Sequence, residues 1–98
     1  MKTYEELREM IGQTVTIKYI KTGNQREGII ADVIDDAPEG YEGVYSIILE
    51  TLNDVKGTVK WNWLFSDDIE IADVIDTDKK ETEWDYQGMD KTMRDTVK

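Results

Sequence analysis

Residues 13–34, QTVTIKYIKTGNQREGIIADVI, decide the fold because their apolar side chains recur at every second position. The first alternating set is Val15, Ile17 and Tyr19. Threonine and lysine fill the positions between, a pattern typical of a half-buried strand rich in β-branched residues. Residues 21–24 (KTGN) predict a turn, since Gly23 supplies a positive φ at low cost. The stretch predicts an antiparallel hairpin.

The second strand of this hairpin is predicted at residues 27–34. Strict alternation divides its side chains into two sets, one of Ile29, Ala31 and Val33, the other of Ile30, Asp32 and Ile34. Gly28, near the start of the strand, permits a sharp bend where a sheet curls.

A short helix is predicted before the hairpin. Thr3 and Glu6 have the spacing of a capping box, in which each side chain accepts a hydrogen bond from the other residue's backbone amide. One apolar stripe follows, made of Tyr4, Leu7 and Ile11 with Met10 beside it. Gly12 is placed to end the helix, and the stripe needs a surface to pack on.

Three more strands are predicted after the hairpin, at residues 45–52, 58–65 and 69–74. Residues 35–43 form a loop that holds the only proline, and residues 53–57 form a hairpin turn. Residues 66–68 fit one helical turn with Ser66 as its cap. Five short strands in meander order, with a bend glycine, predict a small closed barrel that the N-terminal helix plugs at one end.

The composition changes at Asp76, which divides the chain into a helix-plus-barrel domain (residues 1–75) and a charged tail (residues 76–98). The tail is too polar to fold alone, so we expect it to be partly disordered or weakly helical. In the tail, Met89, Met93 and Val97 follow one another at intervals of four residues, a spacing that allows a helix. Trp84 and Tyr86 are hard to explain in so polar a segment; they either attach the tail to the barrel or anchor a partner.

This order of elements resembles an SH3-like barrel, and more specifically a Sm-like one, over residues 4–75. The residues that carry the resemblance are GQTVTI at 12–17, EGIIAD at 27–32 and LFSDDIEI at 64–71. The resemblance implies a mainly β, five-stranded barrel with a short N-terminal helix. The loop motifs with which Sm proteins bind RNA are absent, so it implies no ligand residues here.

Catalysis and metal binding find little support in the composition. The chain has no histidine and no cysteine, which removes the usual zinc sites, His-based general bases and disulfides. The adjacent acids Asp35-Asp36 and Asp67-Asp68 lie on opposite faces wherever the backbone is extended. No segment matches a calcium-binding loop. We therefore expect no enzyme, no catalytic residues, no cofactor and no built metal site.

The net charge of −10 is concentrated in the predicted barrel, where residues 1–75 hold 15 acidic and 7 basic residues. Two blocks, residues 27–54 and 67–78, contain no Lys or Arg. If the second and fifth strands are neighbours, these blocks merge into one negative face. Such a face repels nucleic acid and anionic membranes and attracts basic surfaces; the alternative is a solvated surface that only keeps the protein soluble.

Small phage and plasmid proteins that block restriction or CRISPR nucleases have a similar look, being short, acidic and cysteine-free. The resemblance implies an inhibitor that imitates nucleic-acid phosphates and occupies a basic nucleic-acid-binding protein. The expected partner-binding residues are Asp32, Asp35, Asp36, Glu39, Tyr41, Glu42, Asp67, Asp68 and Glu70. No direct nucleic-acid binding and no membrane binding are expected, and the oligomeric state is open.

The alternative is a structural or adaptor barrel that assembles with itself or grips a peptide through aromatic surface. Val59, Trp61, Trp63 and Phe65 share one strand face. Core packing is the preferred interpretation of this face, because small barrels fill themselves with alternate side chains. No run approaches the roughly 20 apolar residues of a membrane span, and the N-terminus lacks a signal-peptide pattern, so a soluble intracellular protein is expected.

Overall fold

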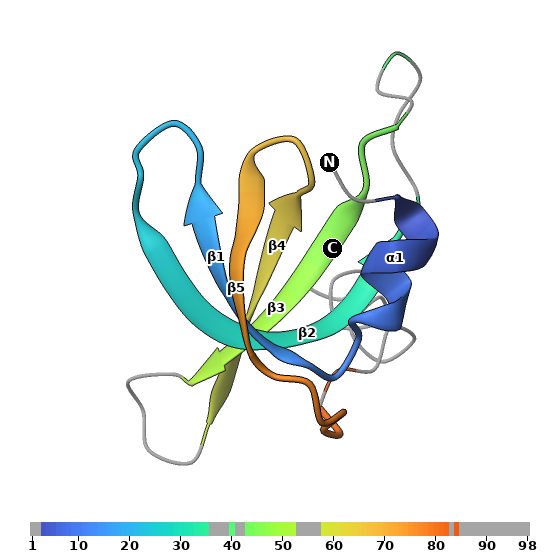
Figure 1. Ribbon diagram of the computed structural model, residues 1–98, viewed down its shortest axis with the longest axis vertical. Helices are drawn as coiled ribbons and strands as arrows, with labels where there is room; N and C mark the ends of the chain where they lie inside the picture. The colour runs from blue at the N-terminus through green and yellow to red at the C-terminus, as the bar shows by residue number, and fades with distance from the viewer. Residues whose placement is uncertain (1–2, 36–39, 41–42, 53–57, 83, 85–98) are drawn as a thin grey trace, which may run out of the picture.

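The computed structural model describes residues 3–35, 40, 43–52, 58–82 and 84. It is mainly β, with one short helix and five antiparallel strands in a single sheet, as the sequence predicts (Figure 1). The elements are α1 (Tyr4–Glu9), β1 (Thr14–Tyr19), β2 (Gln25–Ile34), β3 (Ser46–Leu52), β4 (Val59–Phe65) and β5 (Ile69–Asp76). The predicted loop at 35–43 and turn at 53–57 lie mostly outside the described residues, as does the weak helix of the tail.

The strand order is β4-β3-β2-β1-β5. Strands β1 to β4 form the predicted meander, and β5 returns to pair with β1. Within the described part of the chain no pairing joins the two edge strands, β4 and β5, so the sheet is open and a closed barrel is not confirmed. The expectation that the second and fifth strands are neighbours is wrong, because β1 lies between them.

The helix α1 confirms the predicted capping box. The backbone N–H of Thr3 donates to Glu6 Oε1 (2.9 Å) and that of Glu6 donates to Thr3 Oγ1 (3.1 Å). Gly12 has a φ of +95°, the left-handed conformation expected just after a helix. Among the described residues, no helix has both the length and the apolar content to cross a membrane.

The main core lies where α1 packs against the concave side of the curved sheet (Figure 1). Its buried members are Leu7, Met10, Val15, Ile17, Ile30, Val33, Ile47, Leu49, Leu64 and Ile69. Two of them come from the predicted apolar stripe of the helix region, so α1 is held by the burial of that stripe rather than by its own short length.

The strict alternation predicted for β2 is wrong, because the pairing register slips between Ile30 and Asp32. A β-bulge at this point gives β2 one extra residue, so Val33 lies on the same side of the sheet as Ile30. Both side chains are fully buried in the main core. The close approach at Gly28 is also specific: a Cβ there would lie 2.8 Å from the carbonyl oxygen of Glu50, so the curvature of β2 requires glycine.

The expectation that the aromatic face of β4 fills the core is also wrong. Leu64 pairs in register with Ile47 and is buried in the main core. Alternate residues therefore face the other way, and the side chains of Trp63 and Phe65 are 39% and 46% exposed. The register with β3 determines which face of β4 points inward. The alternation of residues within β4 alone does not reveal that face.

Candidate functional site

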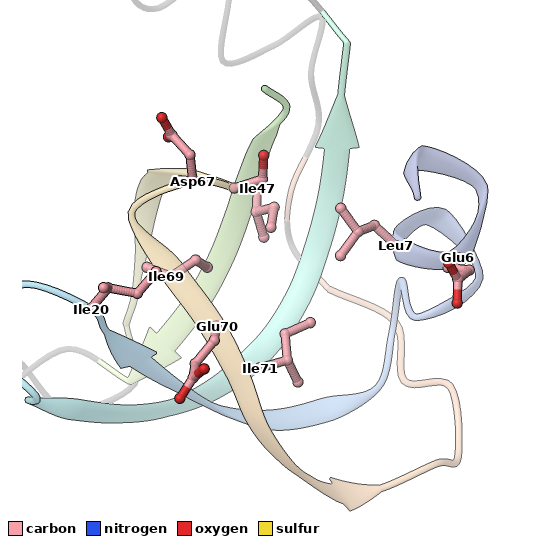
Figure 2. A pocket seen from close by; sticks show the side chains of 9 residues that line it. Glu6, Leu7, Ile20, Ile47, Asp67, Ile69, Glu70 and Ile71 are labelled. Carbon is pink, nitrogen blue, oxygen red and sulfur yellow. The ribbon is translucent and has the colours of Figure 1, made fainter. Parts of the chain in front are cut away.

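A hollow of about 580 Å³ lies between α1, the turn after β4 and β5. We call it the helix-side hollow. It is lined by Glu6, Leu7, Ile20, Ile47, Ser66, Asp67, Ile69, Glu70 and Ile71. Figure 2 shows Leu7 pointing from the helix toward the strands and Ile71 pointing into the same space from β5.

The floor of this hollow is apolar and fixed. Leu7, Ile47 and Ile69 are all buried members of the main core, so their outer surfaces form the floor while their bodies are held by packing. Ile71 packs against that core and is partly exposed. An apolar floor with a few polar groups at its edge is the usual composition of a ligand-binding hollow.

The turn at residues 66–68 carries the edge of the hollow and is tied on both sides. Ser66 N donates to Tyr45 O (2.8 Å), and Tyr45 N donates to Ser66 Oγ (2.9 Å). Ile20 N donates to Asp68 O (3.0 Å). The Ser66 hydroxyl thus joins the turn to Tyr45 instead of capping a helical turn, which corrects the prediction for these residues.

Three carboxylates stand at the rim, and they differ in what they contact. Glu6 accepts the capping hydrogen bond from Thr3 N. Asp67 and Glu70 are exposed, and within the described residues neither side chain has a hydrogen bond or an ion pair. These two are among the partner-binding residues expected from the sequence. Both charges are exposed at the border of the hollow, and the Glu70 side chain lies on the other side of β5 from Ile71 (Figure 2).

The two base-free blocks do not merge in the way expected from neighbouring strands. Glu27 on β2 and Asp73 on β5 both pair in register with Thr16 of β1, so β1 separates them. Lys18 is the next residue of β1 on the same face as Thr16, and it is in register with Glu70. A basic side chain thus interrupts the negative surface.

Asp32 is used inside the molecule. Its carboxylate accepts hydrogen bonds from Val33 N (2.8 Å) and Trp84 Nε1 (3.0 Å) and lies 3.6 Å from Arg8 Nη1. Arg8 also donates to Val33 O (2.6 Å). Asp32 therefore joins the helix, β2 and the segment after β5, and its side chain is only 20% exposed.

The other expected partner-binding residues lie apart from Asp32 or outside the described chain. Asp35 is exposed just beyond β2, and Asp68 is exposed next to Asp67. Four of the expected positions lie outside the described residues: Asp36, Glu39, Tyr41 and Glu42. Tyr86 lies outside them as well.

Trp84 lies on the face of the sheet opposite to the main core. Its ring makes edge contacts with Trp61 (centroids 5.7 Å apart) and Trp63 (6.4 Å). Ile48 pairs in register with both Asp32 and Trp63, is fully buried, and is not part of the main core. We call these five residues the outer-face cluster: Asp32, Ile48, Trp61, Trp63 and Trp84.

The chain reaches this cluster from the end of β5. Lys80 N donates to Gly12 O (2.9 Å), and Lys80 Nζ donates to Thr14 Oγ1 (3.1 Å) and Asp76 Oδ2 (2.9 Å). The ammonium of Lys80 and the backbone N–H of Asp78 lower the pKa of the Asp76 carboxyl from its ordinary value. Lys80, in the first part of the predicted tail, therefore contacts the domain at Gly12 and Thr14.

A second hollow, of about 800 Å³, lies beside the β1–β2 turn. We call it the hairpin-side hollow. It is lined by Tyr19, Ile20, Lys21, Thr22, Asn24, Trp63, Leu64, Phe65, Asp67, Asp68 and Ile69. Three large apolar side chains are exposed in it: Ile20 (60%), Phe65 (46%) and Trp63 (39%). Sequence reasoning missed Ile20, although its position between a strand and a polar turn is a signal for exposure.

Within the described residues, no group of three or more acidic side chains is placed to hold a metal ion. Comparisons of the chain with protein-family models, with curated proteins and with solved structures found no match. The two hollows are the features of the described chain that can accept a ligand.

Proposed function

We propose that this chain is a non-enzymatic binding domain that holds a basic segment of a partner protein at the helix-side hollow. The observation that carries the proposal is the apolar floor bordered by Asp67 and Glu70, two exposed carboxylates without a partner among the described residues.

The chemistry of lysine and arginine fits this arrangement. Each has an apolar stem that packs along hydrophobic surface and a charged head that stays in water. A stem along the apolar floor would leave the head in the water at the border of the hollow, where Asp67 and Glu70 are exposed. The net charge of −10 adds long-range attraction for basic proteins and speeds their association at low salt.

For the partner we propose a basic nucleic-acid-binding protein. A chain of this charge competes for surfaces that otherwise bind phosphates, as small acidic phage-type inhibitors of restriction or CRISPR nucleases do. The exposed carboxylates of Asp35, Asp67 and Asp68 support this idea. Nucleic acid itself is repelled by the same field.

We further propose that the open sheet is a variant of the SH3-like or Sm-like barrel. The return of β5 to the side of β1 and the strong curvature of β2 over Gly28 support this (Figure 1). The turn at residues 66–68 brings the ends of β4 and β5 together at one end of the sheet, where a barrel of this type closes.

A basic probe tests the proposed function. Fluorescein-labelled octalysine is titrated with the protein, and its anisotropy is read at about 0.05 M and 0.3 M salt, which shortens the screening length about 2.5-fold. We expect binding that weakens with salt and that is lost in the D67N/E70Q variant. The control variant D35N/D73N also removes two exposed carboxylates, neither of which lines the hollow, and should retain most of the affinity. Equal loss in both variants would show that only net charge matters and would contradict the proposal.

A second candidate is an adaptor that grips an apolar peptide or a second copy of itself through the aromatic surface. The exposed side chains of Ile20, Trp63 and Phe65 favour it, since aromatic residues are enriched at interfaces. This function predicts binding that salt hardly changes, so the same titration separates the two.

A further inference from the structure

The two hollows share part of their lining. Ile20, Asp67 and Ile69 border both the helix-side hollow and the hairpin-side hollow. A molecule that fills one hollow therefore reaches the edge of the other. The two hollows adjoin along these three residues, and we call them together the recess.

The shared part is rigidly held. Ile69 is 5% exposed and pairs in register with Tyr19 of β1. Ile20 N donates to Asp68 O (3.0 Å), which ties the end of β1 to the turn that carries Asp67. Both hollows therefore keep a fixed position relative to each other, and a ligand need not order them first.

The ends of the recess differ in chemistry. The helix-side end has an aliphatic floor and is bordered by Glu70, which does not line the other hollow, and by Asp67, which the two hollows share. The hairpin-side end presents Ile20 and Phe65 as exposed apolar side chains, with Lys21 and Asp68 also in its lining. A cation suits the first end, and a bulky apolar group suits the second.

We propose that the recess binds one extended segment of a partner protein that carries a basic residue close to a large apolar one. The basic side chain enters the helix-side hollow and the apolar side chain enters the hairpin-side hollow. This inference rests on the proposed function and adds a large apolar residue to the basic one that the domain recognises. Charge complementarity with Asp67 and Glu70 selects the first residue, and burial of exposed Ile20 and Phe65 selects the second.

The spacing within the segment follows from strand geometry. Side chains two apart on an extended chain point the same way and lie about 7 Å apart. The test therefore uses labelled peptides in a glycine-serine background with lysine and phenylalanine two, three or four residues apart, in both orders. Matched peptides replace phenylalanine with alanine, lysine with glutamine, or both.

We expect at least one lysine–phenylalanine peptide to bind about tenfold more tightly than its alanine match, which is the gain expected from burying one large apolar side chain. The variant F65S should abolish most of that gain while leaving the affinity for the lysine–alanine peptide unchanged, because Phe65 lines the hairpin-side hollow and not the helix-side hollow. L52S is the control, because Leu52 is 88% exposed and lines neither hollow. Circular dichroism checks that each variant is folded.

The outcomes separate the inference from the proposed function. If no lysine peptide binds, the proposed function fails. If lysine peptides bind but phenylalanine adds nothing at any spacing, the proposed function stands and the inference is wrong. If the gain is undiminished in F65S, the apolar residue binds elsewhere and the inference is also wrong.

Discussion

The outer-face cluster and the helix-side hollow are built from the same ingredients, apolar side chains beside a carboxylate, yet they differ in what covers them. In the cluster, Trp84 contacts two aromatic rings and donates to Asp32, and Ile48 is fully buried. In the hollow, Asp67 has no partner among the described residues. The cluster therefore contributes to stability, whereas the hollow is available for a ligand.

Acidic residues of the same chain therefore have separate roles. Asp32 satisfies Arg8 and Trp84, so its charge is not free to meet a partner. Net charge alone does not distinguish Asp32 from Asp67, but their hydrogen bonds do. Four predictions follow from the distinction between covered and open regions.

The largest expected effect is on the apolar centre of the cluster. Ile48→Ala should lower the free energy of unfolding by about 2–5 kcal/mol, because Ile48 is fully buried and the change leaves a cavity. Ile20→Ala, in the open recess, should change it by less than about 0.5 kcal/mol, since surface substitutions rarely do more. Urea denaturation of both variants measures the difference. Equal effects would remove the distinction between the two regions.

Trp84→Ala should destabilise the domain by about 2 kcal/mol, because it removes two ring contacts and the hydrogen bond to Asp32. Trp84→Phe keeps a ring but loses the hydrogen bond to Asp32, so about 1 kcal/mol is expected. Thermal unfolding followed by far-UV circular dichroism gives both values. No change in either variant would mean that the contact of Trp84 contributes nothing to stability.

Replacement of Asp32 should change stability, whereas replacement of Asp67 should change binding. Asp32→Ala should lower the free energy of unfolding by about 1–2 kcal/mol, because Arg8 loses an ion pair and Trp84 Nε1 loses its acceptor. Asp67→Ala should leave stability within about 0.5 kcal/mol and weaken the binding of octalysine. Denaturation and anisotropy are measured on the same two preparations. A destabilising Asp67→Ala would show that this carboxylate has a structural partner.

The smallest effect concerns the start of the tail. The lowered pKa of Asp76 means that its contact with Lys80 stabilises the fold above the ordinary carboxyl pKa and that this contribution is lost as pH falls through the lowered value. Lys80→Ala should raise the pKa of Asp76 toward its ordinary value. An NMR titration of the Asp76 carboxyl detects this, and an unchanged pKa would mean that Lys80 is not its cause.

Local features were predictable from the sequence. The capping box needs only Thr3 and Glu6 at the right spacing, and the hairpin needs alternation around a turn with Gly23. Both are confirmed, because the interactions that form them lie within a few residues of chain.

Features set by contacts between distant residues were not predictable. The bulge after Ile30 and the inward face of β4 depend on the registers with β3, which no single strand encodes. The place of Trp84 depends on a contact 52 positions away, at Asp32. Of the candidate site, the sequence indicated Asp67 and Glu70, but the apolar floor beneath them arises only when α1 and β5 are brought together.

The central claim is that a basic segment binds at the helix-side hollow and not at the outer-face cluster. Backbone amide chemical shifts recorded by NMR during a titration with octalysine test it most directly. We expect the largest shift changes at Leu7, Asp67 and Glu70, and no change at Asp32 and Trp84. Changes centred on Asp32 and Trp84, or spread evenly over all acidic residues, would contradict it.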